Sequence, residues 1–217
     1  MSGMKVFRFQ VDEEYAKQHN EMVRDTRSLV VSGIALFVIS TILAAVVWFT
    51  VDSDSPWHLV GSLGALFFGI SMLVVALLIP RSAGNTQQLY DAHPLAPAII
   101  TENAGTTITL TALVNTNIEP ELPPRWAITS RVMRPIPNTS DAVGTKVPVT
   151  AVGAQRDSRD REHWRAITPM PIAWATPDTE VVSQALHSIP EDQWSLLQRA
   201  RKKSDALNDS RDSLVLI

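Results

Sequence analysis

The sequence contains no cysteine, and this absence excludes several kinds of chemistry. Disulfides, thiolate nucleophiles, zinc sites with cysteine ligands and cysteine-ligated iron–sulfur clusters all require a thiol. The sequence also lacks a glycine-rich phosphate loop, a His-Glu-x-x-His pair and a Gly-x-Ser-x-Gly turn. It therefore indicates no catalytic residue, no metal ligand and no cofactor, and we expect a protein that is not an enzyme.

A basic excess is missing as well. The chain has 19 lysines and arginines against 22 acidic residues, which gives a net charge of −3. Surfaces that bind nucleic acid usually carry a basic stripe. We therefore expect no nucleic-acid partner, and no pattern in the sequence indicates a small-molecule substrate.

Charge is absent from two long stretches. Residues 28–51 and 57–80 are 24 residues each, and His58 is their only ionisable side chain. As helices they would each reach about 36 Å, enough to cross a hydrocarbon core of roughly 30 Å. Only residues 52–56 lie between them, so the two spans must run antiparallel. Residues 28–80 are therefore predicted to form a two-helix transmembrane hairpin surrounded by membrane lipid.

Aromatic and basic residues mark the predicted membrane interfaces. Trp48 and Trp57 flank the short link, where an indole ring can face both lipid and water. The link contains no lysine or arginine, whereas Arg24 and Arg27 precede the first span and Arg81 follows the second. Because positively charged flanks remain on the cytoplasmic side, we expect a multi-pass protein of the bacterial plasma membrane. Its N-terminus and its C-terminal domain would both be cytoplasmic.

Small residues recur along the second span. Gly61, Ala65 and Gly69 are four residues apart, so they share one helix face that carries almost no side chain. Such a face allows another helix to approach closely in lipid. The neighbour is either the hairpin's own first span, through Ser40 and Ala44, or a helix of another integral membrane subunit.

The segment before the hairpin, residues 1–27, is predicted to contain a strand and a pre-membrane helix. Residues 5–11 nearly alternate between apolar and polar side chains, which is typical of a half-buried strand. Asp12 is suited to cap a helix. The following residues contain no glycine or proline before the first span, so we expect this helix to continue nearly unbroken into it.

The part after the hairpin, residues 82–217, is predicted to be one β domain with C-terminal helices. It begins with a polar linker, and five β segments follow at 98–101, 106–114, 125–135, 146–155 and 163–174. Their spacing favours a small antiparallel barrel or a strongly bent sheet. Two helices follow. The first is predicted to be capped by Thr176 with Pro177 at its first position, and the second is predicted to begin at Pro190. The apolar residues 214–217 are expected to dock on this domain or on a partner, with fraying as the alternative.

A charged segment separates the last two predicted strands. Asp157, Asp160, Glu162 and His163 are interleaved with four arginines, whose charges already balance the acids. A divalent cation prefers uncompensated carboxylates, so this segment is interpreted as a solvated hairpin tip or a partner-docking patch. Asp91 and His93 are read as linker residues, and His19, His58 and His187 as structural or interfacial.

Two segments resemble a known group of proteins. They are "FRFQVDEEYAKQHNE" near the start of the chain and "TPMPIAWATPDTEVVSQALHSIPEDQW" near its end. Together with the hairpin layout they resemble an actinobacterial family of two-span membrane proteins with a small cytoplasmic β domain. Members of this kind are similar to accessory proteins of the corynebacterial complex III–IV respiratory supercomplex. The resemblance implies that haem and copper belong to neighbouring subunits, and it transfers no catalytic or ligand residue.

These observations define the expected fold and two hypotheses for function. The fold is an α+β membrane protein in which a transmembrane helical hairpin is joined to a small antiparallel barrel or sheet with two C-terminal helices. The first hypothesis is a non-catalytic accessory subunit of a multi-subunit membrane complex, with other integral membrane subunits as partners. The alternative is an independent membrane-tethered scaffold that recruits a soluble cytoplasmic protein.

Overall fold

The computed structural model describes residues 4–83, 85–119, 122–156, 162–201 and 214–217. The chain forms two compact units. One is the segment 21–85, and the other combines the residues up to 20 with residues 86–217. The second unit is therefore built from sequence on both sides of the first.

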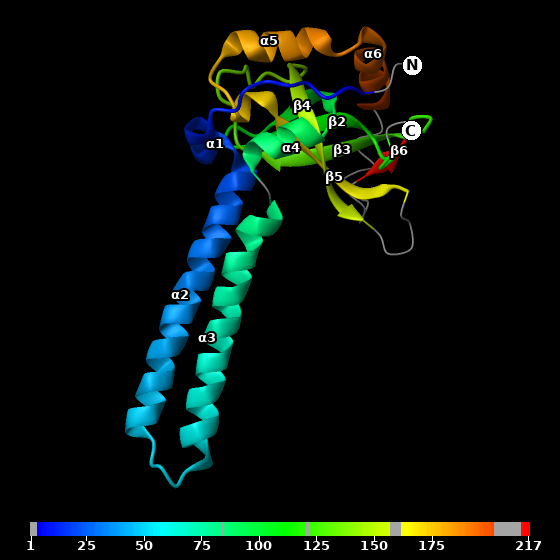
Figure 1. The fold of residues 1–217 in the computed structure, drawn as a ribbon. Coiled ribbons are helices and arrows are strands. Elements are labelled where there is room, and N and C mark those ends of the chain that lie inside the picture. The colour runs from blue at the N-terminus through cyan, green and yellow to red at the C-terminus, as the bar shows by residue number, and fades with distance from the viewer. Residues whose placement is uncertain (1–3, 84, 120–121, 157–161, 202–213) are drawn as a thin grey trace. The chain divides into compact units, whose positions relative to one another are not determined.

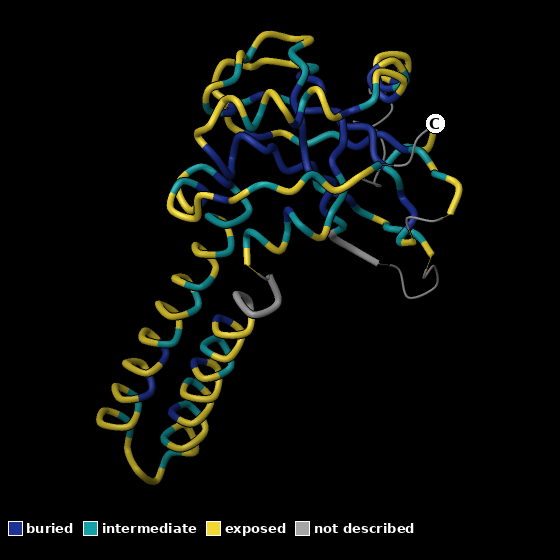
Figure 2. The backbone as a smooth tube through the Cα atoms, turned by 45° about the horizontal axis from the view of Figure 1, so that its top comes forward, coloured by how far each residue is buried: buried dark blue, intermediate teal, exposed yellow. Residues whose placement is uncertain are grey.

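The unit 21–85 is a hairpin of two helices, α2 (Glu21–Thr50) and α3 (Pro56–Ala83) (Figure 1). Both are long and apolar enough to cross a membrane, over residues 21–50 and 56–78. Few of their residues are buried, as the colours in Figure 2 show, whereas a core helix of a soluble protein would be mostly buried. The two predicted candidate spans are confirmed.

Hydroxyl groups within the hairpin are satisfied by the helices that carry them. Thr41, Thr50 and Ser71 each donate to the carbonyl oxygen four residues earlier, at 2.7–2.8 Å. In a hydrocarbon environment an unpaired hydroxyl would be costly. These polar residues are therefore compatible with an apolar surrounding.

The second unit contains a six-stranded antiparallel sheet. Its strands are β1 (Leu95–Asn103), β2 (Ile108–Asn115), β3 (Trp126–Met133), β4 (Lys146–Arg156), β5 (Trp164–Pro171) and β6 (Val215–Leu216). The spatial order is β5-β4-β1-β2-β3-β6. Five strands match the five predicted segments, and the sixth shows that residues 214–217 dock on this domain, where β6 pairs with β3.

The sheet curls, so that β5 approaches β2 and β3. The Thr129 hydroxyl of β3 donates to the Ile167 carbonyl of β5 at 3.1 Å. Just beyond β2, the Trp164 N–H donates to the Thr116 carbonyl at 2.7 Å. Gly153 of β4 leaves room for the Trp164 ring of β5, because a Cβ there would lie 2.5 Å from that ring. The predicted barrel or strongly bent sheet is therefore an incompletely closed, curled sheet.

Two helices follow the strand β5 and complete the core. A 3-10 turn (Ile172–Trp174) leads to α5 (Thr179–Ser188) and α6 (Glu191–Ala200). Trp174 and Trp194 are both buried. Asp178 caps α5 by accepting from the Glu180 N–H at 2.8 Å, so the prediction of Thr176 as the cap was wrong. The Thr176 hydroxyl instead accepts from the Asp178 N–H.

The segment before the hairpin differs from its prediction. Residues 5–11 are extended but form no strand, and α1 (Glu13–His19) ends at Asn20 before α2 begins. Asn20 has extended backbone angles, φ −80 and ψ 110, so the helix is interrupted at this residue. Asp12 caps α1 as predicted, by accepting from the Tyr15 N–H at 3.0 Å.

The predicted polar linker after the hairpin is also partly wrong. Residues 86–92 form the helix α4 (Thr86–Ala92), and β1 already begins at Leu95. Tyr90 of α4 is fully buried. The polar composition of this segment obscured a helix that places one aromatic side chain in the core.

Candidate interaction surfaces

The face of α3 that carries Gly61, Ala65 and Gly69 lies against α2. A Cβ at Gly69 would lie 2.9 Å from the Ser40 Cβ and 3.3 Å from the Phe37 carbonyl oxygen. A Cβ at Gly61 would lie 3.2 Å from a methyl carbon of Val47. Ala65 between them is half-buried. The hairpin's own first helix therefore occupies this face at both glycines.

A third close contact was not predicted. A Cβ at Gly33 of α2 would lie 2.7 Å from the Ala76 Cβ and 3.2 Å from the Met72 carbonyl oxygen. The α2 contact residues Gly33, Ser40 and Val47 are seven residues apart, which is the period of antiparallel helices that pack along their whole length. We call the three contacts Gly33–Ala76, Ser40–Gly69 and Val47–Gly61 the hairpin seam. No pattern of small residues within the first span singles out Gly33, because its partner Ala76 lies on the other helix.

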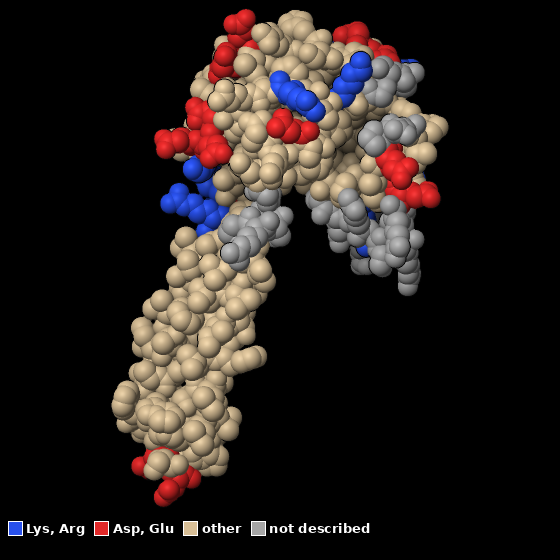
Figure 3. Space-filling view, viewed as in Figure 1, with Lys and Arg blue, Asp and Glu red and all other residues tan. Residues whose placement is uncertain are grey.

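The outer surface of the hairpin is covered by large apolar side chains. Phe49 is 84% exposed and Phe67 is 74% exposed. A Cβ at Gly64 would meet no atom within 4 Å, so this glycine is outside the seam. Figure 3 shows no charged side chain along the shaft of the hairpin and acidic side chains at its tip. The shaft is suited to lipid or to apolar helices.

The tip of the hairpin is ordered by His58. Its Nδ1 lies 2.9 Å from the Val51 carbonyl oxygen, and its ring lies 4.5 Å from the ring of Trp48. Trp57 is 70% exposed. His58 thereby ties the end of α2 to the start of α3, while Trp57 is free to contact an interface.

The arginines predicted at the opposite interface have different surroundings. Arg24 is half-buried and Arg27 is exposed in the first turns of α2. The backbone of Arg81 belongs to α3, but its side chain lies outside the described part of the structure.

Residues 4–20, which we call the N-terminal arm, pack against the rest of the second unit. The amide of Gln87 holds the arm at two points: it accepts from the Val11 N–H at 2.9 Å and donates to the Phe9 carbonyl at 2.9 Å. Further along, the Asp12 N–H donates to the Ala175 carbonyl at 2.9 Å. Val11, Ala16 and Asn20 are buried, so the arm is part of the domain core.

Asn20 and Tyr90 lie at the centre of this contact. The Asn20 amide nitrogen lies 3.3 Å from the sulfur of Met170, and the Tyr90 hydroxyl donates to the Pro171 carbonyl at 2.8 Å. Burial raises the pKa of Tyr90 well above its usual range, and a hydrogen bond with Asn20 offsets part of that rise. The hydroxyl therefore keeps its proton at physiological pH and remains a donor.

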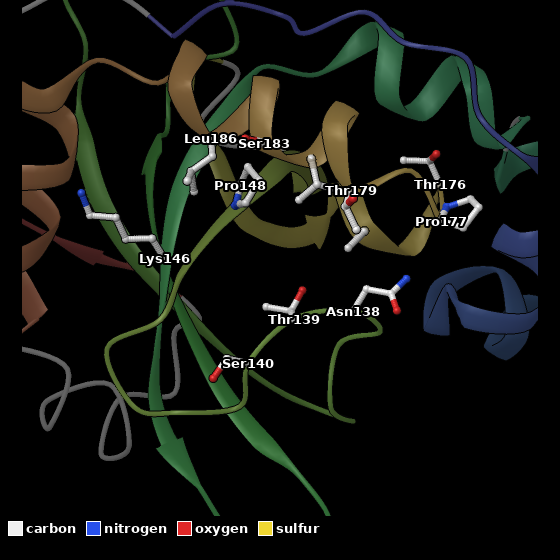
Figure 4. A pocket seen from close by; sticks show the side chains of 12 residues that line it. Asn138, Thr139, Ser140, Lys146, Pro148, Thr176, Pro177, Thr179, Ser183 and Leu186 are labelled. Atoms are coloured by element: carbon white, nitrogen blue, oxygen red, sulfur yellow. The ribbon is translucent and has the colours of Figure 1, made fainter.

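A groove of about 270 Å³ runs beside α5. Figure 4 shows hydroxyl and amide side chains on its two sides, one set on the loop 138–140 and the other on residues 176–183. Several of these hydroxyls serve the local backbone: Thr139 donates to the Pro137 carbonyl, and Ser140 accepts from the Ala142 N–H. The Lys146 ammonium lies 4.9 Å from the Trp194 ring centroid and 3.7 Å from a Glu191 carboxylate oxygen. The positive charge of Lys146 therefore faces the Trp194 ring and the Glu191 carboxylate.

The histidines and acids considered as possible sites are dispersed. Among the described residues, no group of three or more His, Asp or Glu side chains is arranged to hold a metal ion. His19 stacks on Tyr15 at 4.1 Å, and His93 and His187 contact the Leu89 and Ser183 carbonyls through Nδ1. Glu162 and His163 start the return into β5, while Asp157 and Asp160 lie outside the described residues.

Comparison with known proteins places the chain in a family. A crystal structure described as "a putative membrane protein from Corynebacterium diphtheriae" is similar to this chain, with 41% sequence identity and a TM-score of 0.54. The similarity covers 57% of this chain and 99% of that one. No curated protein matches the chain significantly. Together with the two candidate spans, this neighbour suggests a membrane protein. A family model matches residues 81–205, and the chain belongs to that family, DUF3239, described as a protein of unknown function.

Proposed function

We propose that this protein is a non-catalytic accessory subunit of a multi-subunit membrane complex. The observation that carries the proposal is the hairpin seam, in which Gly33, Gly61 and Gly69 let α2 and α3 pack closely. A flexible tether needs no such packing. A rigid pair of helices keeps its outer apolar surface in one arrangement, and a fixed apolar surface is what neighbouring subunits require for specific packing in lipid.

The respiratory complex III–IV supercomplex is the complex that we favour. Support for this choice comes from the sequence resemblance of the segments 7–21 and 168–194 to accessory proteins of that assembly. In this role the protein would cover and stabilise other integral subunits, which would carry the haem and copper.

The domain and both ends of the hairpin are proposed to be cytoplasmic. The arm and residues 86–217 fold as one unit, so both must lie on the same side of a membrane that the hairpin crosses. The arginines near the helix ends away from the tip, and their absence from the tip, favour the cytoplasmic side. An impermeant amine reagent on intact cells should therefore leave Lys146, which is partly exposed, unmodified until the cells are permeabilised. Equal labelling before and after permeabilisation would contradict this orientation.

Co-purification tests the accessory role. The tagged full-length chain, extracted in mild detergent from its own membranes, is expected to carry integral membrane subunits in fixed stoichiometry, identified by mass spectrometry. These partners should remain when the membranes are first washed with alkaline carbonate, because such a wash removes only peripheral proteins. Migration as a lone small protein after the mildest extraction would refute the proposal.

The same experiment addresses the alternative, a membrane-tethered scaffold for a soluble cytoplasmic protein. One observation favours this alternative: a neighbour that was crystallised is covered over 99% of its length by only 57% of this chain, so a much shorter chain of this kind exists as a folded body. A scaffold would lose its partners in the carbonate wash, whereas an accessory subunit would keep them.

A further inference from the structure

The strand β6 is a minor addition to the sheet. β3 pairs with β2 along all eight of its residues, but with β6 only at Ala127–Leu216 and Ile128–Val215. One further backbone bond runs from the Ile217 N–H to the Trp126 carbonyl at 3.2 Å. The family match ends at residue 205, before β6. The other five strands form the domain's sheet, and β6 occupies the edge of β3 that they leave.

The contact that holds β6 is chemically simple. Residues 214–217 read Leu-Val-Leu-Ile, and Leu216 is 48% exposed and Ile217 37% exposed in the docked position. An edge strand offers backbone N–H and C=O groups to any extended peptide that fits beside it. The β3 edge at Trp126–Ile128 therefore accepts a short apolar strand that runs antiparallel to it.

The sequence between α6 and β6 is long and polar. Twelve residues, 202–213, lie between Arg201, which caps the end of α6, and residue 214, and ten of them are polar or charged. Twelve residues can span at most about 40 Å. Exchange of an identical element between copies needs only a connection of this kind and a docking site that is the same in each copy.

We propose that the β3 edge is a self-association site that takes the β6 strand of a second copy of this chain. We commit to a second copy as the occupant, because it brings a β6 strand identical to the one that pairs with β3 here. In an exchange, each β3–β6 contact within one copy is replaced by the same contact between two copies, so the strand pairing itself costs little. Two copies anchored in one membrane also have a high local concentration. The result is a dimer joined through reciprocal strand addition.

The pairing geometry provides a direct test. Because the Ile217 N–H bonds to Trp126, the next pair, Ala127–Leu216, is a non-hydrogen-bonded pair, in which opposing side chains are closest. Cysteines at such a pair can form a disulfide, and the chain contains no cysteine of its own. Two differently tagged full-length copies, one Ala127→Cys and one Leu216→Cys, are co-expressed and oxidised in isolated membranes.

The proposal predicts a mixed, reducible dimer at least fivefold above the dimer that either variant forms alone. Replacing the Leu216→Cys copy with Val215→Cys should abolish the mixed dimer, because successive residues of a strand face opposite sides. A mixed dimer that is unchanged by this control would overturn the proposal, since it would reflect mere proximity. The double variant Ala127→Cys/Leu216→Cys forms an intrachain disulfide if β6 stays in its own domain. An intrachain disulfide in the double variant, without any mixed dimer between the single variants, would also overturn the proposal. The absence of both the intrachain disulfide and the mixed dimer would overturn it as well.

Discussion

Replacing Gly69 with leucine is expected to separate the two helices of the hairpin, whereas the same change at Gly64 leaves them together. A Cβ at residue 69 meets the Ser40 Cβ at 2.9 Å and the Phe37 carbonyl oxygen at 3.3 Å, and a helix backbone cannot move aside locally. At residue 64 the added side chain meets no atom within 4 Å. Overpacking of this kind costs about 1–3 kcal/mol. Both changes add one leucine to the same helix, so membrane insertion should be equal.

Cross-linking across the seam measures this effect. A cysteine pair at Val47 and Gly61, where the Gly61 Cβ would lie 3.2 Å from Val47, should oxidise rapidly in membranes. Adding Gly69→Leu is expected to slow the oxidation roughly tenfold, because a loss of about 1.4 kcal/mol in the free energy of closing the hairpin reduces the closed population tenfold. Gly64→Leu should leave the oxidation rate unchanged. Equal rates for the two leucine variants would show that the seam does not hold the hairpin closed.

The seam also shows what the sequence could and could not reveal. The Gly61, Ala65 and Gly69 face was visible because small residues at four-residue spacing stand out in a run of large apolar ones. Gly33 was not, because a single glycine acquires its meaning only from Ala76 on the opposite helix. The sequence left the choice of neighbour open, and only the packed hairpin shows that α2 approaches these glycines.

The β domain was predicted to different degrees along its length. The strands lie within a few residues of the predicted segments, because alternating side chains in short runs define them directly. Curling of the sheet was anticipated in general terms, but the approach of Thr129 to Ile167 depends on contacts between distant strands. The docking of residues 214–217 followed from their apolar character, while the choice of the β3 edge did not.

The N-terminal arm was the largest difference from expectation. Phe7, Phe9 and Val11 alternate as in a strand, but Phe9 and Val11 bond through their backbone to the Gln87 side chain. The neighbouring Lys5 carbonyl and Asp12 N–H each bond to a single backbone group instead of to a strand ladder. The pattern correctly indicated a half-buried segment, and it could not identify what covers the apolar face. The helix breaks at Asn20, where the side chain is buried against Met170, and no local signal in the sequence predicts this contact.

An Ala16→Glu substitution in the arm is therefore expected to destabilise the β domain, although most of that domain lies far away in the sequence. Ala16 is fully buried in α1, whereas Gln18, two residues further on, is exposed. A glutamate at residue 16 must either bury a charge or pull the arm away, which would expose Tyr90, Met170 and the start of β1 to water. Burying an unpaired charge typically costs several kcal/mol. For a domain of this size a loss of about 3 kcal/mol lowers the melting temperature by roughly 6–12 °C.

The melting temperature of the full-length chain in mild detergent can be followed through tryptophan fluorescence, because Trp174 and Trp194 are buried in the domain core. Gln18→Glu introduces the same charge on the same helix and should change the melting temperature by no more than about 1–2 °C, since exposed substitutions usually stay within 0.5 kcal/mol. If the two glutamate variants melt together, the arm is not part of the domain's cooperative core. If only Ala16→Glu melts early, the domain depends on sequence from both sides of the hairpin. Its folding is then completed only after both helices have been made and the arm and the domain have met on the same side of the membrane.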